Sequence, residues 1–233
     1  MSQEPLFIFG NGYGAFFGAV DQNELHQNAA YQIVLGQDSQ VKIIDDDNSI
    51  YVGNIILIKP LAKHRIKCDG PISLIYLSPK SNFVLCHLKH IDTADITSLK
   101  ASNLPFSSKS SSGEIIDTLN RVVQNPKSNL DPRLIMALDD LGCDLQNASI
   151  AQTAEHCGIS RSRLRALARE QLGLPLSTWV IWKKLIEANK AVSSGASLSE
   201  AALLGGFSDQ AHFTRSMKRM FGVTPTNALK ILT

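Results

Sequence analysis

The chain has 233 residues, 44% of them hydrophobic, and a formal net charge of +2. This length gives room for two domains that each bury a core. The small total charge hides an asymmetry, because residues 145–233 hold 11 Lys and Arg against 5 Asp and Glu, whereas residues 1–144 hold 12 against 16. A basic C-terminal part suits a surface that faces phosphates, although ordinary protein surfaces carry similar excesses.

The cysteines and the apolar runs argue against a zinc-cluster protein and against a membrane protein. The four cysteines, Cys68, Cys86, Cys143 and Cys157, form no C-x-x-C pair, which argues against a zinc cluster and favours reduced thiols. No apolar run approaches the roughly 20 residues of a membrane span, and the N-terminal MSQEP is not basic. We therefore expect a soluble, cytoplasmic protein without a metal or cofactor and without a membrane partner.

Short apolar or alternating runs predict strands between residues 6 and 90. They are residues 6–9, 15–20, 31–35, 41–44, 55–58, 72–77 and 83–88. Turn residues separate most of them, as in Gly10-Asn11-Gly12, which we interpret as a hairpin turn. Many short strands at nearly even spacing are typical of a small sandwich or barrel. Residues 1–90 are thus predicted to form a β-domain.

Residues 91–130 are predicted to connect this domain to the next. The segment begins polar and rich in serine, with SSKSSS at 107–112. Its later part has apolar residues at helical spacing: Ile115, Ile116, Leu119, Val122 and Val123. A helix with such a face either pairs two copies of the chain or packs against the chain's own β-domain.

A helical domain is predicted from residue 131 to residue 233. It begins at Asp131-Pro132, a helix cap followed by a proline suited to the first turn. Near its end, residues 198–204 predict a short helix that Gly205-Gly206 terminates, because glycine enters a left-handed turn at little steric cost. Ser208 or Asp209 can cap the helix that follows.

The helix after Asp209 has one apolar face and one basic face. The apolar stripe consists of Phe213, Met217, Met220 and Phe221, and the opposite face carries Arg215, Lys218 and Arg219. A short helix, a glycine turn and such a second helix are typical of a helix-turn-helix unit that inserts its second helix into a major groove. For this segment alone, two packed helices with a solvated basic face are the simpler interpretation.

The same pattern occurs a second time, which favours the helix-turn-helix interpretation. Residues 150, 154, 158, 159 and 160 match in kind the residues 48 positions later. After the turn the offset becomes 49, and it pairs Leu164 with Phe213 and Gly173 with Gly222. A repeat that keeps a glycine turn and an apolar stripe in register indicates two copies of one supersecondary unit.

Residues 176–192 lie between the two copies and predict a connecting helix. Its apolar residues include Trp179 and Trp182, which we expect to be core residues. About 16 helical residues span roughly 24 Å, which suits two recognition helices about one DNA turn, roughly 34 Å, apart.

Residues 131–229, and above all GFSDQAHFTRSMKRMFGVTPT at 206–226, resemble the DNA-binding domain of the AraC/XylS family of bacterial transcriptional regulators. The first unit departs from the second where it reads GLPL in place of GVTP. The resemblance implies a two-domain α+β protein. In it a small cupin-like β jelly roll precedes an all-α domain with two helix-turn-helix units joined by a long helix.

The resemblance also implies which residues contact DNA. The family's base-reading positions fall on Ser162, Arg165 and Ala166 in the first recognition helix, and on Gln210, Ala211, His212 and Arg215 in the second. Arginine can donate two hydrogen bonds to guanine, and glutamine can pair with adenine. The cations beside these positions are expected to bind phosphates: Arg161, Arg169, Lys218 and Arg219.

For the β-domain, the cupin-like resemblance rests on His26, on the strand that holds Gln32 and on the Pro60 to His64 turn. It makes His26, Gln32 and His64 candidate ligand-binding residues. A metal-free pocket is favoured over a catalytic metal, because Asn28 stands two residues after His26 and no Glu follows at cupin spacing. Hydrogen bonding of both histidines to loop backbone is the competing interpretation.

These features predict a DNA-binding regulator and no enzymatic activity. The expected partners are promoter DNA, RNA polymerase, a second copy of the chain, paired through the helix at residues 114–124, and a small-molecule effector in the β-domain. Two rival hypotheses are a metal-dependent cupin enzyme with a helical accessory domain and an effector-independent dimeric DNA-binding protein.

Overall fold

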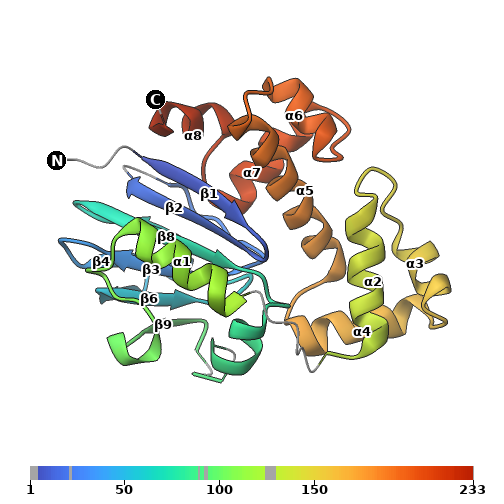
Figure 1. The fold of residues 1–233 in the computed structure, drawn as a ribbon, viewed down its shortest axis with the longest axis horizontal. Coiled ribbons are helices and arrows are strands. Elements are labelled where there is room, and N and C mark those ends of the chain that lie inside the picture. Colours follow the sequence, from blue (N-terminus) through green and yellow to red (C-terminus); the bar gives the residue numbers. More distant parts are fainter. Residues whose placement is uncertain (1–4, 21–22, 89, 92–93, 124–129, 233) are drawn as a thin grey trace. The chain divides into compact units, whose positions relative to one another are not determined.

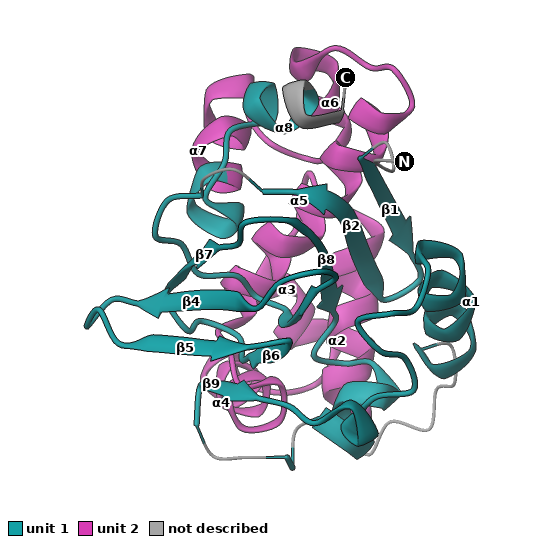
Figure 2. Ribbon diagram, turned by 90° about the vertical axis from the view of Figure 1, so that its left-hand side faces the viewer, with its two compact units in different colours: residues 1–128, 218–233 teal, residues 129–217 magenta. Residues whose placement is uncertain are grey.

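The computed structural model describes residues 5–20, 23–88, 90–91, 94–123 and 130–232. It divides into two compact units, residues 1–128 together with 218–233, and residues 129–217 (Figure 2). A β-rich region is followed by a helical region, so the predicted two-domain α+β class is confirmed (Figure 1).

The strands of the first unit form two antiparallel sheets (Figure 1). The larger sheet has the order β1 (Leu6–Gly10), β2 (Tyr13–Ala19), β8 (Pro71–Leu77), β3 (Tyr31–Gly36), β6 (Ile55–Ile58) and β9 (Ile96–Ser98). The smaller sheet has the order β5 (Ile50–Gly53), β4 (Val41–Asp45) and β7 (His64–Lys67). Most neighbours in the larger sheet are far apart in the chain, so long-range packing sets the strand order.

The hairpin predicted at Gly10-Asn11-Gly12 is confirmed. β1 and β2 are antiparallel, with Gly10 opposite Tyr13 at the turn. Gly12 has a φ of 85°, a backbone conformation that glycine adopts without a steric penalty.

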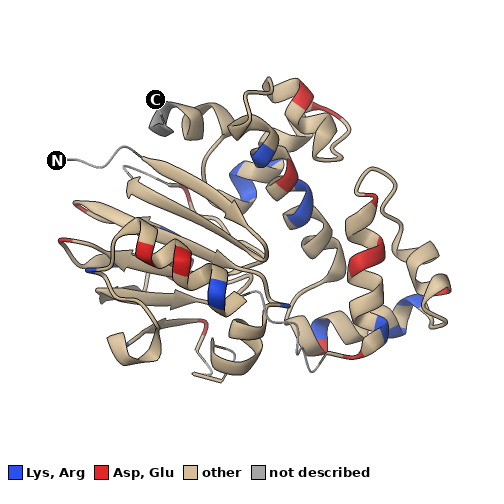
Figure 3. Cartoon of the chain, in the orientation of Figure 1, with Lys and Arg blue, Asp and Glu red and all other residues tan. Residues whose placement is uncertain are grey.

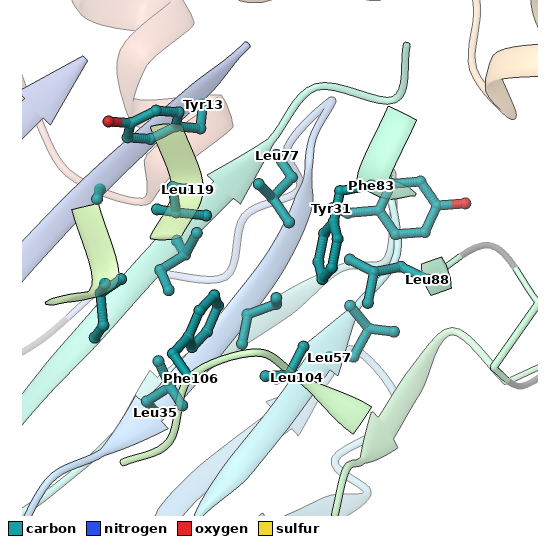
Figure 4. Packing of buried hydrophobic residues seen from close by; sticks show 14 of the residues in the cluster. Tyr13, Tyr31, Leu35, Leu57, Leu77, Phe83, Leu88, Leu104, Phe106 and Leu119 are labelled. Atoms are coloured by element: carbon teal, nitrogen blue, oxygen red, sulfur yellow. The ribbon is translucent and has the colours of Figure 1, made fainter. Parts of the chain in front are cut away.

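The β-domain core draws on both the larger sheet and the segment predicted to be a connector (Figure 4). β3 is buried along its whole length, with Ile33 opposite both Ile75 and Leu57. Leu104 and Phe106 pack in the same cluster. Residues 91–130 therefore contribute side chains to the β-domain core.

α1 (Ser112–Val123) turns its apolar side toward this core. Ile115, Leu119 and Val123 are buried there, and Ile116 and Val122 pack against the cluster half-buried. Of the two roles that the sequence allows this helix, packing against the chain's own β-domain is the one observed.

The prediction of a strand at residues 83–88 is wrong, because this segment is helical. Val84–Leu88 form a short π-helix, η1. Ser81 starts the helical turn by accepting hydrogen bonds from Val84 N at its Oγ (3.4 Å) and from Leu85 N at its carbonyl oxygen (3.0 Å). A short, mostly apolar run fits a buried helical turn as well as a strand, and the local cap decides between them.

The second unit consists of helices. They are α2 (Pro132–Cys143), α3 (Ile150–His156), α4 (Arg161–Leu172), α5 (Leu176–Ser193), α6 (Leu198–Leu204) and α7 (Gln210–Phe221) up to Met217. The end of α7 and α8 (Pro225–Leu232) group with the first unit. The predicted cap is confirmed, since Asp131 Oδ1 accepts a hydrogen bond from Arg133 N at 2.9 Å.

α5 is the long helix predicted between the repeats. It has 18 residues and spans roughly 27 Å at 1.5 Å per residue. Trp179 and Trp182 are 1% and 3% exposed, so their predicted role as core residues is confirmed.

Replacing Gly205 with alanine is expected to lower the free energy of unfolding by about 1–3 kcal/mol, because it overpacks the contact between α6 and α5. A Cβ atom there would lie 2.6 Å from Ala188 Cβ and 2.7 Å from the Lys184 carbonyl oxygen. Urea denaturation measures the effect. Gly113→Ala is the control, because a Cβ atom at that helical position meets nothing within 4 Å. Equal losses in both variants would contradict the close approach of α6 to α5.

Candidate nucleic-acid interface

The first helix-turn-helix unit consists of α3 and α4. Ser149 Oγ caps α3 by accepting a hydrogen bond from Gln152 N, and Ser160 Oγ caps α4 by accepting one from Arg163 N at 3.2 Å. Between them Gly158 has a φ of 66°, the left-handed conformation that ends α3. The local sequence of caps and glycine thus sets the turn.

α4 presents its basic side to solvent. Leu164, Leu167 and Ala168 form the buried stripe, as predicted. The structure places the candidate DNA-binding residues of this helix on the other side: Arg161, Ser162, Arg165 and Arg169 are exposed, and Ala166 is half-buried.

The second unit consists of α6 and α7 and repeats this construction. Ser197 and Glu200 form a capping box at the start of α6, and Gly206, with a φ of 79°, ends it. Asp209 is the cap of α7, because its Oδ1 accepts a hydrogen bond from His212 N at 2.7 Å. Lys184 of α5 fixes the turn by donating a hydrogen bond from Nζ to the Gly206 carbonyl oxygen at 2.6 Å.

α7 also separates an apolar from a polar face. Phe213, Met217, Met220 and Phe221 are buried, as predicted. Among the candidate residues before Lys218, Gln210, Ala211 and Arg215 are exposed and His212 is half-buried. The amide of Gln210 is held by α6, because Ser199 Oγ donates a hydrogen bond to Gln210 Oε1 at 2.7 Å.

The backbone geometry repeats with the sequence, which confirms the duplication. Gly158 and Gly206, 48 residues apart, both adopt positive φ. Gly173 and Gly222, 49 residues apart, do so at the ends of α4 and α7, with φ of 76° and 71°. The offset changes between the two pairs, as predicted from the side chains alone.

Three arginines on α4 are free to contact a partner outside the chain. Lys and Arg residues recur along α4 and α7 (Figure 3). Within the described part of the chain, Arg161, Arg165 and Arg169 make no ion pair, whereas Arg163 pairs with Glu170 at 3.5 Å. Such guanidinium groups can bind phosphates or guanine without first breaking an internal contact.

Lys218 and Arg219 lie in a different environment from the other candidates. Both are exposed and group with the β-rich unit. Lys218 Nζ pairs with Glu24 Oε1 at 2.9 Å, and the Arg219 carbonyl oxygen accepts a hydrogen bond from Gln27 N at 3.2 Å. A phosphate contact by Lys218 therefore has to replace the ion pair with Glu24.

The candidate ligand residues of the β-domain come together in its interior. His26, Gln32 and His64 are each no more than 3% exposed. His64 Nε2 lies 2.9 Å from Gln32 Oε1, His64 Nδ1 lies 2.9 Å from the Ala62 carbonyl oxygen, and the two imidazole rings are 4.3 Å apart. His26 Nδ1 is 2.9 Å from the Glu24 carbonyl oxygen, so backbone bonding by both histidines is observed.

Burial lowers the pKa of His26 to about 4 and that of His64 to about 3, and the neighbouring His26 further lowers the pKa of His64. Below about pH 6.5, where free histidine titrates, the unfolded chain therefore binds more protons than the folded chain. We expect full stability above pH 6.5 and a loss of about 2 kcal/mol per histidine at pH 5. Urea denaturation of wild type and His64→Gln at pH 7.5 and 5.0 measures this. An equal pH-dependent loss in both proteins would contradict a neutral, buried His64.

Two contacts that orient residues of this site were not predicted from the sequence. Ser199 is eleven residues from Gln210 and on another helix, so no local pattern reveals their contact. The capping box of Ser197 and Glu200 does have a sequence signal, the S-x-x-E pattern.

Within the described residues, no helix is long and apolar enough to cross a bilayer. In the same part of the chain, no three His, Cys, Asp or Glu side chains are grouped so that they could hold a metal ion.

Comparison with known proteins locates relatives for the helical part of the chain. A family model described as "Helix-turn-helix domain" matches residues 153–231. The arabinose operon regulatory protein of Escherichia coli (strain K12) is 29% identical over 114 residues, which are 48% of this chain and 38% of that protein. The probable transcription factor PqrA of Proteus vulgaris is 33% identical over 81 residues, 34% of this chain and 66% of that protein. The chain spans about a third of the length of the first curated relatives it matches.

Solved structures of ToxT from Vibrio cholerae resemble the fold of the whole chain. A 1.65 Å structure has a TM-score of 0.61 at 16% identity and covers 96% of this chain and 100% of that chain. A structure of ToxT from strain SCE256 bound to an unsaturated fatty acid has a TM-score of 0.58 at 13% identity. It covers 100% of this chain and 98% of that chain. By its duplicated helix-turn-helix unit and its sequence similarity to these regulators, the helical part of the chain belongs to the AraC/XylS family of transcriptional regulators.

Proposed function

We propose that the protein regulates transcription by binding promoter DNA through α4 and α7. The observation that carries the proposal is the duplicated unit, in which each copy ends in a helix with exposed arginines. In this arrangement Arg165, Gln210, His212 and Arg215 read base edges, and Arg161 and Arg169 contact phosphates. Lys218 and Arg219 add phosphate contacts once the ion pair of Lys218 with Glu24 opens.

Selection of bound sequences from random duplexes tests this function. We expect enrichment of a site with two conserved segments about one helical turn, roughly 10 base pairs, apart. We also expect the affinity to fall steeply with salt, because phosphate contacts release counterions. Recovery of unenriched sequence after repeated rounds would contradict sequence-specific binding.

Regulation of a promoter implies further partners. We include RNA polymerase and a second copy of this chain in the proposal, and a cytoplasmic location follows from it. Because the apolar side of α1 is occupied by the chain's own core, a homodimer would use another surface. Sedimentation equilibrium distinguishes a monomer from a dimer.

We further propose that the β-rich unit binds a small acidic effector. A cleft of about 670 Å³ lies beside β7, and its charged lining residues are Arg65, Lys67 and Asp69, two cations against one carboxylate. Cationic side chains favour a carboxylate, and the ToxT structure bound to an unsaturated fatty acid supports a ligand of this class. His26, Gln32 and His64 do not line this cleft, so their contact with a ligand stays a prediction that requires the buried cluster to open.

Calorimetric titration with an unsaturated long-chain fatty acid tests the effector proposal. We expect binding to the wild type and a several-fold loss of affinity in Lys67→Ala. Lys42→Ala is the matched control, since Lys42 is also exposed and lies opposite Lys67 in the sheet but does not line the cleft. Equal affinities of the two variants would place the ligand elsewhere.

A further inference from the structure

The first turn of α7 contains a chain of three polar side chains whose proton positions can be worked out. Asp209 Oδ1 caps the helix by accepting the hydrogen bond from His212 N at 2.7 Å. The backbone hydrogen bond from His212, and then the side-chain bond from Ser208, lower the pKa of Asp209 below its ordinary value. Asp209 is therefore ionised at neutral pH, and a carboxylate can only accept hydrogen bonds.

Ser208 connects this carboxylate to His212. Its Oγ lies 2.9 Å from Asp209 Oδ2 and 3.3 Å from His212 Nδ1. A hydroxyl group has one proton, and Asp209 must receive it because Asp209 cannot donate. Ser208 Oγ then acts as the acceptor toward His212, so the proton of the neutral imidazole lies on Nδ1.

The remaining nitrogen of His212 is consequently an acceptor. In neutral imidazole one nitrogen donates and the other accepts, so protonation of Nδ1 leaves Nε2 with a free lone pair. The ring also makes a T-shaped contact with the buried Phe207, whose centroid is 5.1 Å away at an interplanar angle of 82°. Two contacts thus fix both the orientation and the hydrogen-bonding polarity of a half-exposed side chain.

We propose that Ser208 and Asp209 are positioning residues that hold His212 in the Nδ1–H tautomer, so that α7 reads a base that donates a hydrogen bond. In the major groove the donors are the N4 amino group of cytosine and the N6 amino group of adenine, whereas guanine offers only acceptors. The base facing His212 is therefore adenine or cytosine, and guanine is rejected. This inference rests on the proposed DNA binding by α7.

Asp209→Asn is the variant that reverses the polarity. Asparagine caps helices as well as aspartate does, so α7 keeps its first turn. Its amide nitrogen donates to Ser208 Oγ, which then donates its own proton to His212 Nδ1 and moves the imidazole proton to Nε2. In sequence selection we expect the preferred base at one position to change from adenine or cytosine to guanine or thymine, whose polar groups in the major groove are acceptors only. Ser208→Ala, which removes the connection, is expected to leave that position without a preference.

The tautomer is measured without DNA, which separates this inference from the proposed function. Nitrogen-15 spectra of the histidine side chains are recorded on the full chain at pH 8, above the range in which histidine ordinarily titrates, and His212→Gln assigns the signal. We expect a protonated Nδ1 in the wild type and a protonated Nε2 in Asp209→Asn. A protonated Nε2 in the wild type would overturn the proposal whether or not the protein binds DNA.

A separate result would contradict the proposal that His212 reads a base. If the tautomer changes as expected in Asp209→Asn but the selected base does not, His212 does not read that base and this part of the proposal is overturned. Failure of every variant and of the wild type to bind DNA would instead contradict the proposed function, with the tautomer still decided by the spectra.

Discussion

Replacing Trp179 with alanine is expected to lower the free energy of unfolding of the helical unit by about 3–5 kcal/mol. Trp179 is 1% exposed, among the largest fully buried side chains, and lies on α5 between the two repeated units. Removing its ring leaves a cavity that the surrounding helices fill only in part. A domain is ordinarily stable by about 5–15 kcal/mol, so the loss takes a large share of that stability.

Urea denaturation followed by circular dichroism measures the loss. Trp179→Phe is the control, because phenylalanine keeps an aromatic ring of smaller volume and should lose less stability. An alanine variant as stable as the phenylalanine variant would contradict a close-packed Trp179.

Replacing Arg215 with alanine is expected to weaken binding to the preferred duplex about 10- to 100-fold, and binding to random duplexes much less. A bidentate contact from arginine to guanine is worth about 1–3 kcal/mol of discrimination. Arg215 is exposed on the polar side of α7, opposite the buried Phe213 and Met217. Fluorescence anisotropy with both kinds of duplex measures the ratio of affinities.

Arg169→Ala is the matched control for Arg215→Ala. Arg169 is also exposed on a recognition helix, and its proposed partner is a phosphate. Its loss should weaken binding to both duplexes alike and reduce the slope of log affinity against log salt by about one unit. A ratio of affinities unchanged by Arg215→Ala would mean that Arg215 does not read sequence.

Local signals made the helical unit predictable. Caps such as Asp131, the glycine turns and the apolar stripes of α4 and α7 act within a few residues, and the structure has them where the sequence places them. The length of α5 differs from the prediction by only about one residue at its end, within the ordinary uncertainty of helix boundaries.

The β-domain was only partly predictable, because its strand order depends on contacts between distant residues. The long apolar strands β3 and β8 were found, but β5, β7 and β9 were not. β7 reads HRIK and β9 has three residues, so neither has an apolar run to reveal it. Their pairing with β4 and β6 stabilises them.

The outward positions of the recognition helices follow from the helical period, and that part of the candidate interface could be read from the sequence. The hydrogen bonds that orient Gln210 and His212 could not, since they depend on the side-chain rotamers of Ser199 and Ser208. The ion pair of Lys218 with Glu24 joins residues 194 positions apart, so no local sequence pattern predicts it.

The central claim is that α4 and α7 insert together into one DNA duplex. Directed cleavage of DNA from each of these helices tests it most directly. An iron chelate is attached to a cysteine at position 162 on α4 or at position 211 on α7, in a chain whose four native cysteines are replaced. We predict that each protein cuts the selected duplex at one centre and that the two centres lie about 10 base pairs apart. Cleavage at a common centre, or from only one of the two helices, would contradict the simultaneous insertion of α4 and α7 into one duplex.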